Sequence, residues 1–265
     1  MQSAMTSTSR CAIAATTRLP RRSLASSAYF PPRAGGPSRP PTPPSSSPPQ
    51  PTPPSSSTHP TLPSSIPHPD PSSDATTSTP RLSPSEHALV SSIIRVDQAG
   101  ELGANWIYRG QKYGSLLRGD TSTARQVSEM WENEKHHLKT MALLRAQHDV
   151  RPTVLYPLWQ GLAFGLGLGT ALLGREAAMA CTEAVETVIG EHYDDQIRAL
   201  KPLIEKHDHP SLPLLRDVLK EFRDDELEHL DTAVEEGAQK APGHSLLSAV
   251  IGAGCKAAIK VCEKI

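Results

Sequence analysis

Apolar side chains recur at spacings of three and four residues in four long segments of the chain. These segments run from about 83 to 117, 121 to 148, 175 to 205 and 214 to 236. Such spacing places the apolar residues on one face of a helix, because an α-helix has about 3.6 residues per turn. No segment alternates as a half-buried strand would. The pattern therefore predicts an all-α fold built on four amphipathic helices.

The first helix has a clear start signal. Ser83 suits the N-cap position, Pro84 suits the first turn, and Glu86 stands three residues after the cap. Together they form a capping-box pattern, so we expect the fold to begin near residue 83. A further helix, rich in Ala, Val and Ile, is predicted from about 245 to 263.

The chain before residue 83 has a different composition. Residues 1 to 69 contain six Arg and many Ser and Thr, but no Asp, Glu or Lys. This is typical of a mitochondrial transit peptide, expected over residues 1 to 30, although a basic tail has the same composition. Residues 31 to 82 are dominated by Pro and Ser and are expected to be disordered. The folded domain is expected over residues 83 to 265, a single-domain size.

Charge and cysteine content narrow the possible functions. The formal net charge of −1 gives no basis for binding nucleic acid. The four cysteines lack the paired spacing of a zinc site and do not resemble a disulfide framework. In a reducing compartment we expect them to be thiols.

A repeated pattern of ionisable residues lies within the apolar faces of the four helices. Residues 134 to 140 and 226 to 232 each carry Glu-x-x-His followed by Leu and Thr. Upstream of each segment, another glutamate is followed seven residues later by a tyrosine. These two pairs are Glu101 with Tyr108 and Glu186 with Tyr193. The chain therefore contains a doubled Glu…Glu-x-x-His pattern.

The doubled pattern predicts a dinuclear metal site. Four carboxylates and two imidazoles on four helices are the ligand set of a carboxylate-bridged di-iron centre. Residues at i and i+3 lie on one helix face, about 4.5 Å apart along the axis, so each Glu-x-x-His reaches one metal region. Ionised carboxylates in an apolar face must also be paired, protonated or bound to metal. The predicted ligands are Glu101, Glu134, His137, Glu186, Glu226 and His229.

Several neighbouring residues are candidates for supporting positions. Glu183 lies one turn before a predicted ligand and resembles one, but the equivalent position in the first helix is not acidic. Asp97 and Asp225 are candidate partners for imidazole N–H groups. Tyr108 and Tyr193 either line an oxygen pocket or pack as ordinary buried aromatic residues. No catalytic residue beyond the metal ligands is predicted.

An uncharged run from Pro152 to Gly174 separates the second and third helices. It is long enough to span a bilayer, but a crossing would place half of the predicted ligands on each side. We therefore expect an apolar segment that docks into one leaflet, with Tyr156 and Trp159 at the headgroup boundary. A buried core helix is the alternative.

Residues 95 to 104, Arg-Val-Asp-Gln-Ala-Gly-Glu-Leu-Gly-Ala, resemble the first-helix signature of the mitochondrial demethoxyubiquinone hydroxylases of ubiquinone biosynthesis. Four later blocks, at residues 180 to 186, 193 to 198, 222 to 229 and 253 to 255, also resemble this family. The resemblance covers about residues 85 to 265. It implies a ferritin-like four-helix bundle with an additional apolar membrane-docking segment and a C-terminal helix.

The resemblance also implies an activity and its setting. The family's members are di-iron monooxygenases that use dioxygen to hydroxylate the ring of demethoxyubiquinone or its quinol. Two iron ions would be held by the six predicted ligands, with NADH as the electron source. The family further implies a lipid-binding companion protein, a ubiquinone-biosynthesis complex, and a peripheral position on the matrix side of the mitochondrial inner membrane.

Three other interpretations are open at this point. A ferritin-like quinol oxidase would use the same metal set to reduce dioxygen to water. An iron-storage or metal-binding structural protein would not need the apolar run. An interaction module with solvated Glu and His faces would bind no stoichiometric iron.

Overall fold

The computed structural model describes residues 72–265 and is almost entirely helical. Its helices are α1 (Asp74–Thr77), α2 (Pro84–Leu117), α3 (Thr121–Gln147), α4 (Tyr156–Leu173), α5 (Arg175–Lys206), α6 (Ser211–Glu235) and α7 (His244–Cys262), with a 3-10 turn at Ala238–Lys240. The described part of the chain contains no strand, as predicted. The expected transit peptide and most of the expected disordered segment lie outside the described residues.

Ordered structure begins before residue 83, where the fold was expected to start. The short helix α1 packs against α3 and α6. The side-chain amide of Gln147 donates hydrogen bonds to the carbonyl oxygens of Ala75 and Ser78, at 2.8 and 2.9 Å. The composition of this segment did not predict these contacts, because they depend on residues far away in the chain.

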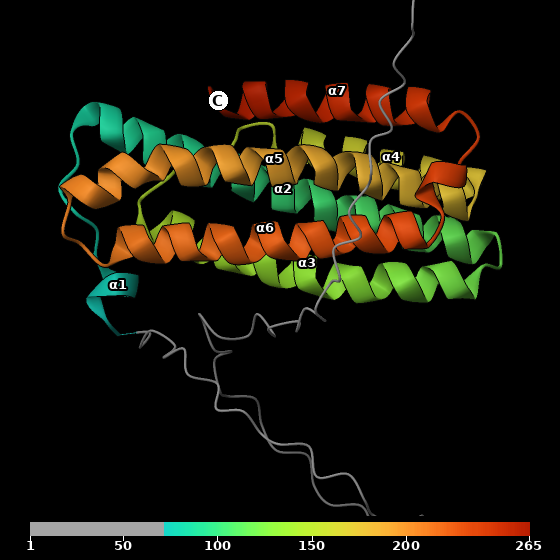
Figure 1. The fold of residues 1–265 in the computed structure, drawn as a ribbon, viewed down its shortest axis with the longest axis horizontal. Coiled ribbons are helices and arrows are strands. Elements are labelled where there is room, and N and C mark those ends of the chain that lie inside the picture. The colour runs from blue at the N-terminus through green and yellow to red at the C-terminus, as the bar shows by residue number, and fades with distance from the viewer. Residues whose placement is uncertain (1–71) are drawn as a thin grey trace, which may run out of the picture.

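The helices α2, α3, α5 and α6 form the ferritin-like four-helix bundle that was expected (Figure 1). In the first half of the described chain, α4 follows α3 and returns to pack along α2. In the second half, α7 follows α6 and returns to pack along α5. Figure 1 shows α7 lying along one edge of the bundle. Each half therefore consists of two bundle helices and one apolar covering helix.

The helix boundaries follow local signals with one exception. The capping box at the start of α2 is present: the Ser83 side chain accepts from Glu86 N–H, and the Glu86 carboxylate accepts from Ser83 N–H. Helix α6 begins at Ser211, three residues before the expected start at Leu214. Pro213 does not prevent this, because N–H groups in the first turn have no partner within the helix.

Helix α4 lies so close to α2 that only glycine fits at their contact. A Cβ atom added at Gly167 would lie 2.0 Å from the carbonyl oxygen of Ile107. A Cβ atom at Gly110 would lie 2.4 Å from the carbonyl oxygen of Phe164. The opposite face of α4 exposes four leucines, Leu158, Leu162, Leu172 and Leu173. The helix is therefore half-buried, which excludes the fully buried core helix considered above.

Trp159, which is expected at a headgroup boundary, is partly buried in the structure. Its side chain packs toward the bundle against Val96, Ala99 and Cys262. Its indole nitrogen is buried and has no hydrogen-bond partner among the described residues. The aromatic ring therefore contributes to the interior on this side of the bundle.

Among the described residues, α7 is the one helix with the length and apolar composition of a membrane span, and this is weak evidence on its own. Only 11% of its most apolar stretch is buried. Leu246 and Val250 on this helix are 71% and 62% exposed. The two covering helices therefore both present apolar side chains on the outside of the bundle.

Candidate metal centre

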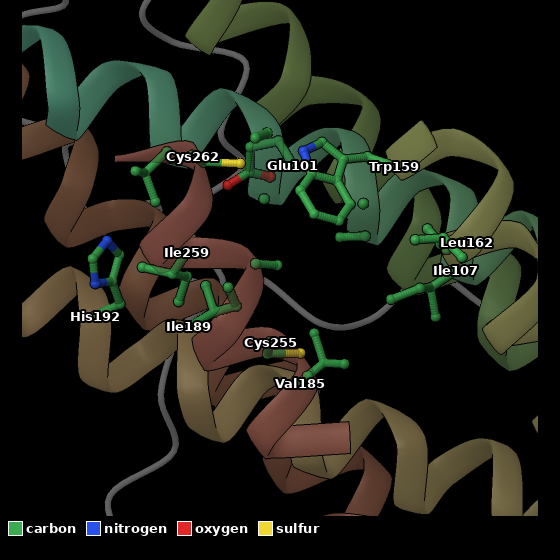
Figure 2. A pocket seen from close by; sticks show the side chains of 18 of the residues that line it. Glu101, Ile107, Trp159, Leu162, Val185, Ile189, His192, Cys255, Ile259 and Cys262 are labelled. Carbon is green, nitrogen blue, oxygen red and sulfur yellow. The ribbon is translucent and has the colours of Figure 1, made fainter. Parts of the chain in front are cut away.

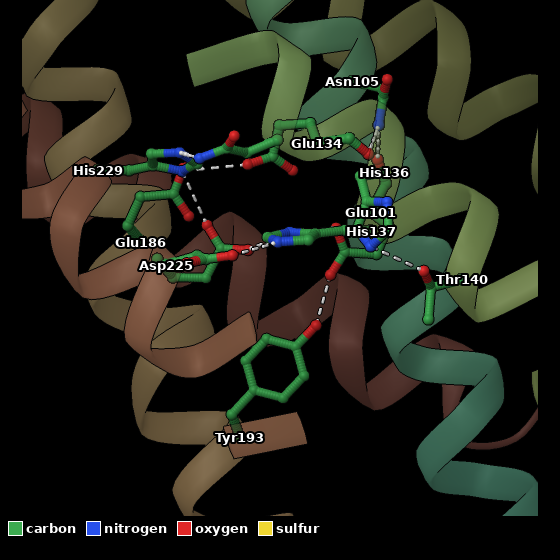
Figure 3. Close-up of polar contacts among 12 residues, drawn as sticks. Glu101, Asn105, Glu134, His136, His137, Thr140, Glu186, Tyr193, Asp225 and His229 are labelled. Carbon is green, nitrogen blue, oxygen red and sulfur yellow. Dashed lines mark hydrogen bonds and ion pairs between the residues drawn. The ribbon is translucent and has the colours of Figure 1, made fainter. Parts of the chain in front are cut away.

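All six predicted ligands meet in the interior of the bundle (Figure 3). Their ligand atoms form two groups, within each of which all atoms lie within 4.8 Å of one another. The groups are Glu101, Glu134, His137 and Glu226, and Glu134, Glu186, Glu226 and His229. Glu134 and Glu226 belong to both groups. The structure thus has two adjacent clusters that share two carboxylates.

Apolar clusters enclose the six residues at both ends along the bundle axis. One cluster includes Ile94, Met141 and Phe222. The other includes Met130 and Met179. Because these side chains come from the same helices as the ligands, a turn or two away, they hold the helices together and keep water from the carboxylates.

Several buried ligand atoms lack well-aligned hydrogen bonds. Glu134 and His137 are completely inaccessible to solvent. Both carboxylate oxygens of Glu134, Oε2 of Glu101 and Nδ1 of His137 form no well-aligned hydrogen bond with the described residues, although carboxylate–imidazole contacts of 3.1 to 3.4 Å surround them. A buried polar atom without a partner costs about 1–3 kcal/mol. Carboxylate oxygens and imidazole nitrogens are ligands of divalent iron, so these residues fit a di-iron site.

The imidazole of His137 is oriented with Nδ1 toward the cluster. This nitrogen lies 3.4 Å from Oε2 of Glu101 and 3.3 Å from Oε1 of Glu226. On the other side of the ring, Nε2 lies 3.0 Å from Oδ2 of Asp225. The ring also stacks on Phe222, with 3.9 Å between the ring centroids. Asp225 therefore occupies the predicted position behind an imidazole.

His229 has the same orientation but a different partner. Its Nδ1 lies 3.1 Å from Oε1 of Glu134 and 3.1 Å from Oε2 of Glu226. Its Nε2 lies 3.4 Å from the side-chain nitrogen of Asn133. The other acid expected behind an imidazole, Asp97, is not there.

Two glutamines that the sequence analysis did not single out connect α2 and α5. These two helices carry Glu101 and Glu186, which are called the outer glutamates below. Gln196 donates to Oδ1 of Asp97 at 2.6 Å. Gln111 donates to the carbonyl oxygen of Ala178 at 2.9 Å and to Oγ1 of Thr182 at 3.2 Å. Each glutamine follows the glutamate of its own helix by ten residues. Aligning the two halves at these glutamates would have revealed the pair.

The two tyrosines bind the outer carboxylates across the bundle. Tyr108 of α2 donates to Oε1 of Glu186 on α5 at 2.8 Å. Tyr193 of α5 donates to Oε1 of Glu101 on α2. Each tyrosine therefore holds the glutamate of the opposite helix, a role that neither of the two interpretations from the sequence included.

Asn105 was also missed, although it links two ligand positions. Its side-chain amide donates to the carbonyl oxygens of Glu101 and Glu134, at 2.9 and 2.6 Å. Its own oxygen accepts from Nε1 of Trp131 at 3.1 Å. The sequence provides no signal for this role, because a single Asn on an apolar helix face has many possible partners.

Glu183 lies outside both ligand groups. Its carboxylate lies 2.5 Å from Nε2 of His244, at the start of α7. The residue that resembled a ligand in the sequence therefore connects α5 to the covering helix instead.

Ionisation of the buried carboxylates is unfavourable without a cation. Burial raises the pKa values of Glu101, Glu134 and Glu186 above the ordinary range for glutamate. Burial also opposes ionisation of Glu226, but the imidazoles of His137 and His229, at 3.3 and 3.1 Å from its oxygens, outweigh burial and lower its pKa. A divalent metal would displace protons from the first three carboxylates.

A cavity of about 380 Å³ reaches one side of the cluster. It lies between α2, α4, α5 and α7, and apolar side chains such as Ile107, Val185 and Ile259 form most of its wall (Figure 2). Of the six ligands, only Glu101 lines it, together with its partner Tyr193. An apolar molecule of moderate size would therefore approach the cluster from the Glu101 side.

Comparison with known proteins identifies the family. Residues 88–262 match the family profile described as "Ubiquinone biosynthesis protein COQ7". The chain is 50% identical over 177 residues to the "NADPH-dependent 3-demethoxyubiquinone 3-hydroxylase, mitochondrial" of Rattus norvegicus, covering 67% of this chain and 78% of the rat protein.

Two relatives with lower sequence identity have similar names. The "5-demethoxyubiquinone hydroxylase, mitochondrial" of Saccharomyces cerevisiae is 44% identical over 191 residues, covering 69% of this chain and 82% of the yeast protein. The "3-demethoxyubiquinol 3-hydroxylase" of Rhodospirillum rubrum is 43% identical over 182 residues, covering 69% of this chain and 81% of the bacterial protein. The chain therefore belongs to the COQ7 family of ubiquinone biosynthesis proteins.

Proposed function

We propose that this protein is a mitochondrial di-iron monooxygenase that hydroxylates the ring of a demethoxyubiquinone in ubiquinone biosynthesis. The observation that carries the proposal is the pair of adjacent ligand groups that share Glu134 and Glu226. Two shared carboxylates between two imidazole-containing positions are the arrangement of a bridged di-iron centre. The rat and yeast relatives described above are named as demethoxyubiquinone hydroxylases.

In this proposal the six residues divide into two outer pairs and one shared pair. Glu101 and His137 would hold one iron, Glu186 and His229 would hold the other, and Glu134 and Glu226 would be shared between them. When bound and reduced, the two irons supply the electrons that activate dioxygen. The chain itself orients the ligands through tyrosine hydrogen bonds and excludes water with the surrounding apolar clusters.

The cavity is the proposed binding site for the quinone ring. Its rim includes Leu162 and Val250, which are 57% and 62% exposed on α4 and α7. A substrate with a long apolar tail would leave the tail along these helices while its ring enters toward Glu101. We propose that the exposed faces of α4 and α7 rest on the inner membrane from the matrix side without crossing it.

The reductant is a finer part of the proposal. The resemblance in the sequence implies NADH, whereas the rat relative is named NADPH-dependent. We propose a reduced nicotinamide dinucleotide as the electron source, and rates measured separately with NADH and NADPH would identify which one. A lipid-binding companion protein that presents the substrate, within a ubiquinone-biosynthesis complex, is likewise proposed from the family alone.

The central experiment combines Glu186→Ala with a matched control, Glu183→Ala. Both changes remove a carboxylate from α5, one turn apart, but only Glu186 belongs to a ligand group. We expect Glu186→Ala to abolish ring hydroxylation and lower the iron content, whereas Glu183→Ala retains both. Two irons per chain and full activity in Glu186→Ala would contradict the proposed centre.

The same assay separates the hydroxylase from its alternatives. Purified protein would be given demethoxyubiquinol, a reductant and isotopically labelled dioxygen. Label in the quinone ring supports the hydroxylase. Label in water alone supports a quinol oxidase, and iron without turnover supports an iron-binding protein.

A further inference from the structure

The two imidazoles of the cluster meet different partners at equivalent positions. The residue before Glu226 contacts Nε2 of His137, and the residue before Glu134 contacts Nε2 of His229. In the first case this residue is Asp225, with Oδ2 3.0 Å from the imidazole. In the second it is Asn133, whose amide is neutral whichever of its ends faces the ring. The ligands of the two halves match, but this supporting pair does not.

A carboxylate behind a metal-bound imidazole strengthens its bond to the metal. With Nδ1 facing the metal, Nε2 carries the proton and donates it to the partner. Hydrogen bonds to a charged acceptor are roughly twice as strong as those to a neutral one. Loss of such a partner typically weakens metal binding by about 10- to 100-fold. Asp225 should therefore favour metal at the His137 position over the His229 position.

The ring of His137 is also held more rigidly. It stacks on Phe222 with 3.9 Å between centroids and 26° between the ring planes. His229 meets Tyr108 only edge-on, at 5.9 Å and 74°. A ligand already fixed in its binding orientation loses less freedom when the metal binds. This difference favours the same metal position as Asp225 does.

The favoured position is also the one that the cavity reaches. Of the six candidate ligands, only Glu101 lines the cavity, together with Tyr193, which donates to it. A molecule in the cavity is therefore closer to the metal held by Glu101 than to the metal held by Glu186.

We propose that the two metal positions are unequal: the position formed by Glu101 and His137 binds a divalent metal more tightly than the position formed by Glu186 and His229, and it is the one that faces the substrate. The proposal rests on the di-iron centre proposed above. It adds an order of metal loading and a direction of substrate approach to that centre.

The first test is a titration of the metal-free, full-length protein with Co(II), followed by calorimetry and visible absorption. We expect two binding steps in the wild-type protein, separated by about tenfold or more in affinity. Asp225→Asn should weaken the tighter step by about 10- to 100-fold and leave the weaker step unchanged. Asn133→Asp should strengthen the weaker step, which gives a second variant with the opposite sign.

Asp224→Asn is the matched control. It removes the same charge one residue away, at a side chain that is 54% exposed and pairs with Arg223. Equal affinities in the wild-type protein would overturn the inference but not the di-iron centre. An effect of Asp224→Asn as large as that of Asp225→Asn would also overturn the inference. The change in affinity would then come from the net charge and not from the hydrogen bond to His137. A protein that binds no Co(II) would overturn both.

The second test locates the substrate. The probe is a short-tailed benzoquinone with one unsubstituted ring position, added to protein that holds a single equivalent of Co(II). We expect the probe to shift the visible absorption of this first metal. A shift that occurs only after the second equivalent has bound would overturn the inference, because the cavity would then face the weaker position.

Discussion

The first half of the described chain, α2 to α4, and the second half, α5 to α7, differ least at the six candidate ligands and their immediate neighbours. Each half provides a glutamate with a tyrosine seven residues later and a glutamine ten residues later, then Glu-x-x-His on the next helix. The tyrosines and glutamines of both halves reach across the bundle to the opposite half. Each half thus contributes the same set of residues to the candidate metal centre.

Away from the ligands the halves diverge. Four residues after its glutamate, the first half has Asn105, which holds two ligand positions together. The equivalent residue in the second half is Gly190, which cannot form such a link. The covering helices also differ, because α4 packs through backbone contacts at glycine and α7 does not. The two halves therefore share the candidate ligands but differ in the residues that support them.

The largest expected difference between the halves concerns the covering helices. Gly167→Ala would place Cβ 2.0 Å from the carbonyl oxygen of Ile107, so α4 must move away from α2. We expect a loss of about 3 kcal/mol in the free energy of unfolding. Gly252→Ala on α7 meets only the side chain of Val188, at 3.6 Å, and should cost less than about 0.5 kcal/mol. Urea denaturation measures both.

Gly165→Ala is the control within α4. A Cβ atom at this position meets nothing within 4 Å, and alanine is the better helix former. Stability should therefore be unchanged or rise by up to about 1 kcal/mol. An equal loss in Gly165→Ala and Gly167→Ala would show that the close helix contact is not the cause.

Acid should lower the free energy of unfolding through His148, the residue that ends α3 in the first half. Burial, with His209 and His87 nearby, lowers the pKa of His148 from 6.5 to about 4. Between these values the unfolded chain takes up a proton that the folded chain does not, so stability falls as the pH drops from about 6.5 to 4. The loss reaches about 3 kcal/mol at most. The residue that ends α6, Glu236, pairs with Arg175 instead.

His148→Gln should remove this part of the pH dependence. The measurement is the free energy of unfolding at pH 7 and pH 5, compared between the variant and the wild-type protein. Because the other ionisable groups are the same in both proteins, the difference isolates His148. The same slope in both would contradict the assignment.

A smaller effect is expected from the position four residues after the outer glutamates. Asn105→Ala removes two buried hydrogen bonds and leaves Nε1 of Trp131 without its acceptor, so it should cost about 2 kcal/mol. Gly190→Ala in the second half meets only Leu227, at 3.6 Å, and should stabilise α5 slightly. Thermal denaturation of the two variants measures both effects. It tests whether the residue four positions after the glutamate stabilises the bundle only in the first half.

The smallest effect is expected from the tyrosines, where the halves match. Tyr108→Phe and Tyr193→Phe each remove one hydrogen bond to a glutamate, and each should cost about 1 kcal/mol. Melting of both metal-loaded variants would show whether the costs are similar. A difference of several kilocalories per mole would mean that the halves also diverge at the ligands.

Local patterns in the sequence were sufficient for the helices and the ligands. The spacing of apolar residues predicted the four long helices, since periodicity along one helix depends only on that helix. The same periodicity predicted that Glu101, Glu134 and their four counterparts point inward, and the structure brings all six together. Helix α6 begins three residues before the predicted start, because a proline such as Pro213 is tolerated in the first turn of a helix.

Partners across the bundle were decided only by the tertiary structure. The sequence did not reveal that Tyr108 holds Glu186, that Trp159 faces the interior, or that Glu183 pairs with His244. These contacts depend on how each helix is rotated and how closely it approaches its neighbour, which packing of the whole bundle determines. The six candidate ligands were therefore predictable from the chain by itself, whereas the different partners of the two imidazoles depended on the fold.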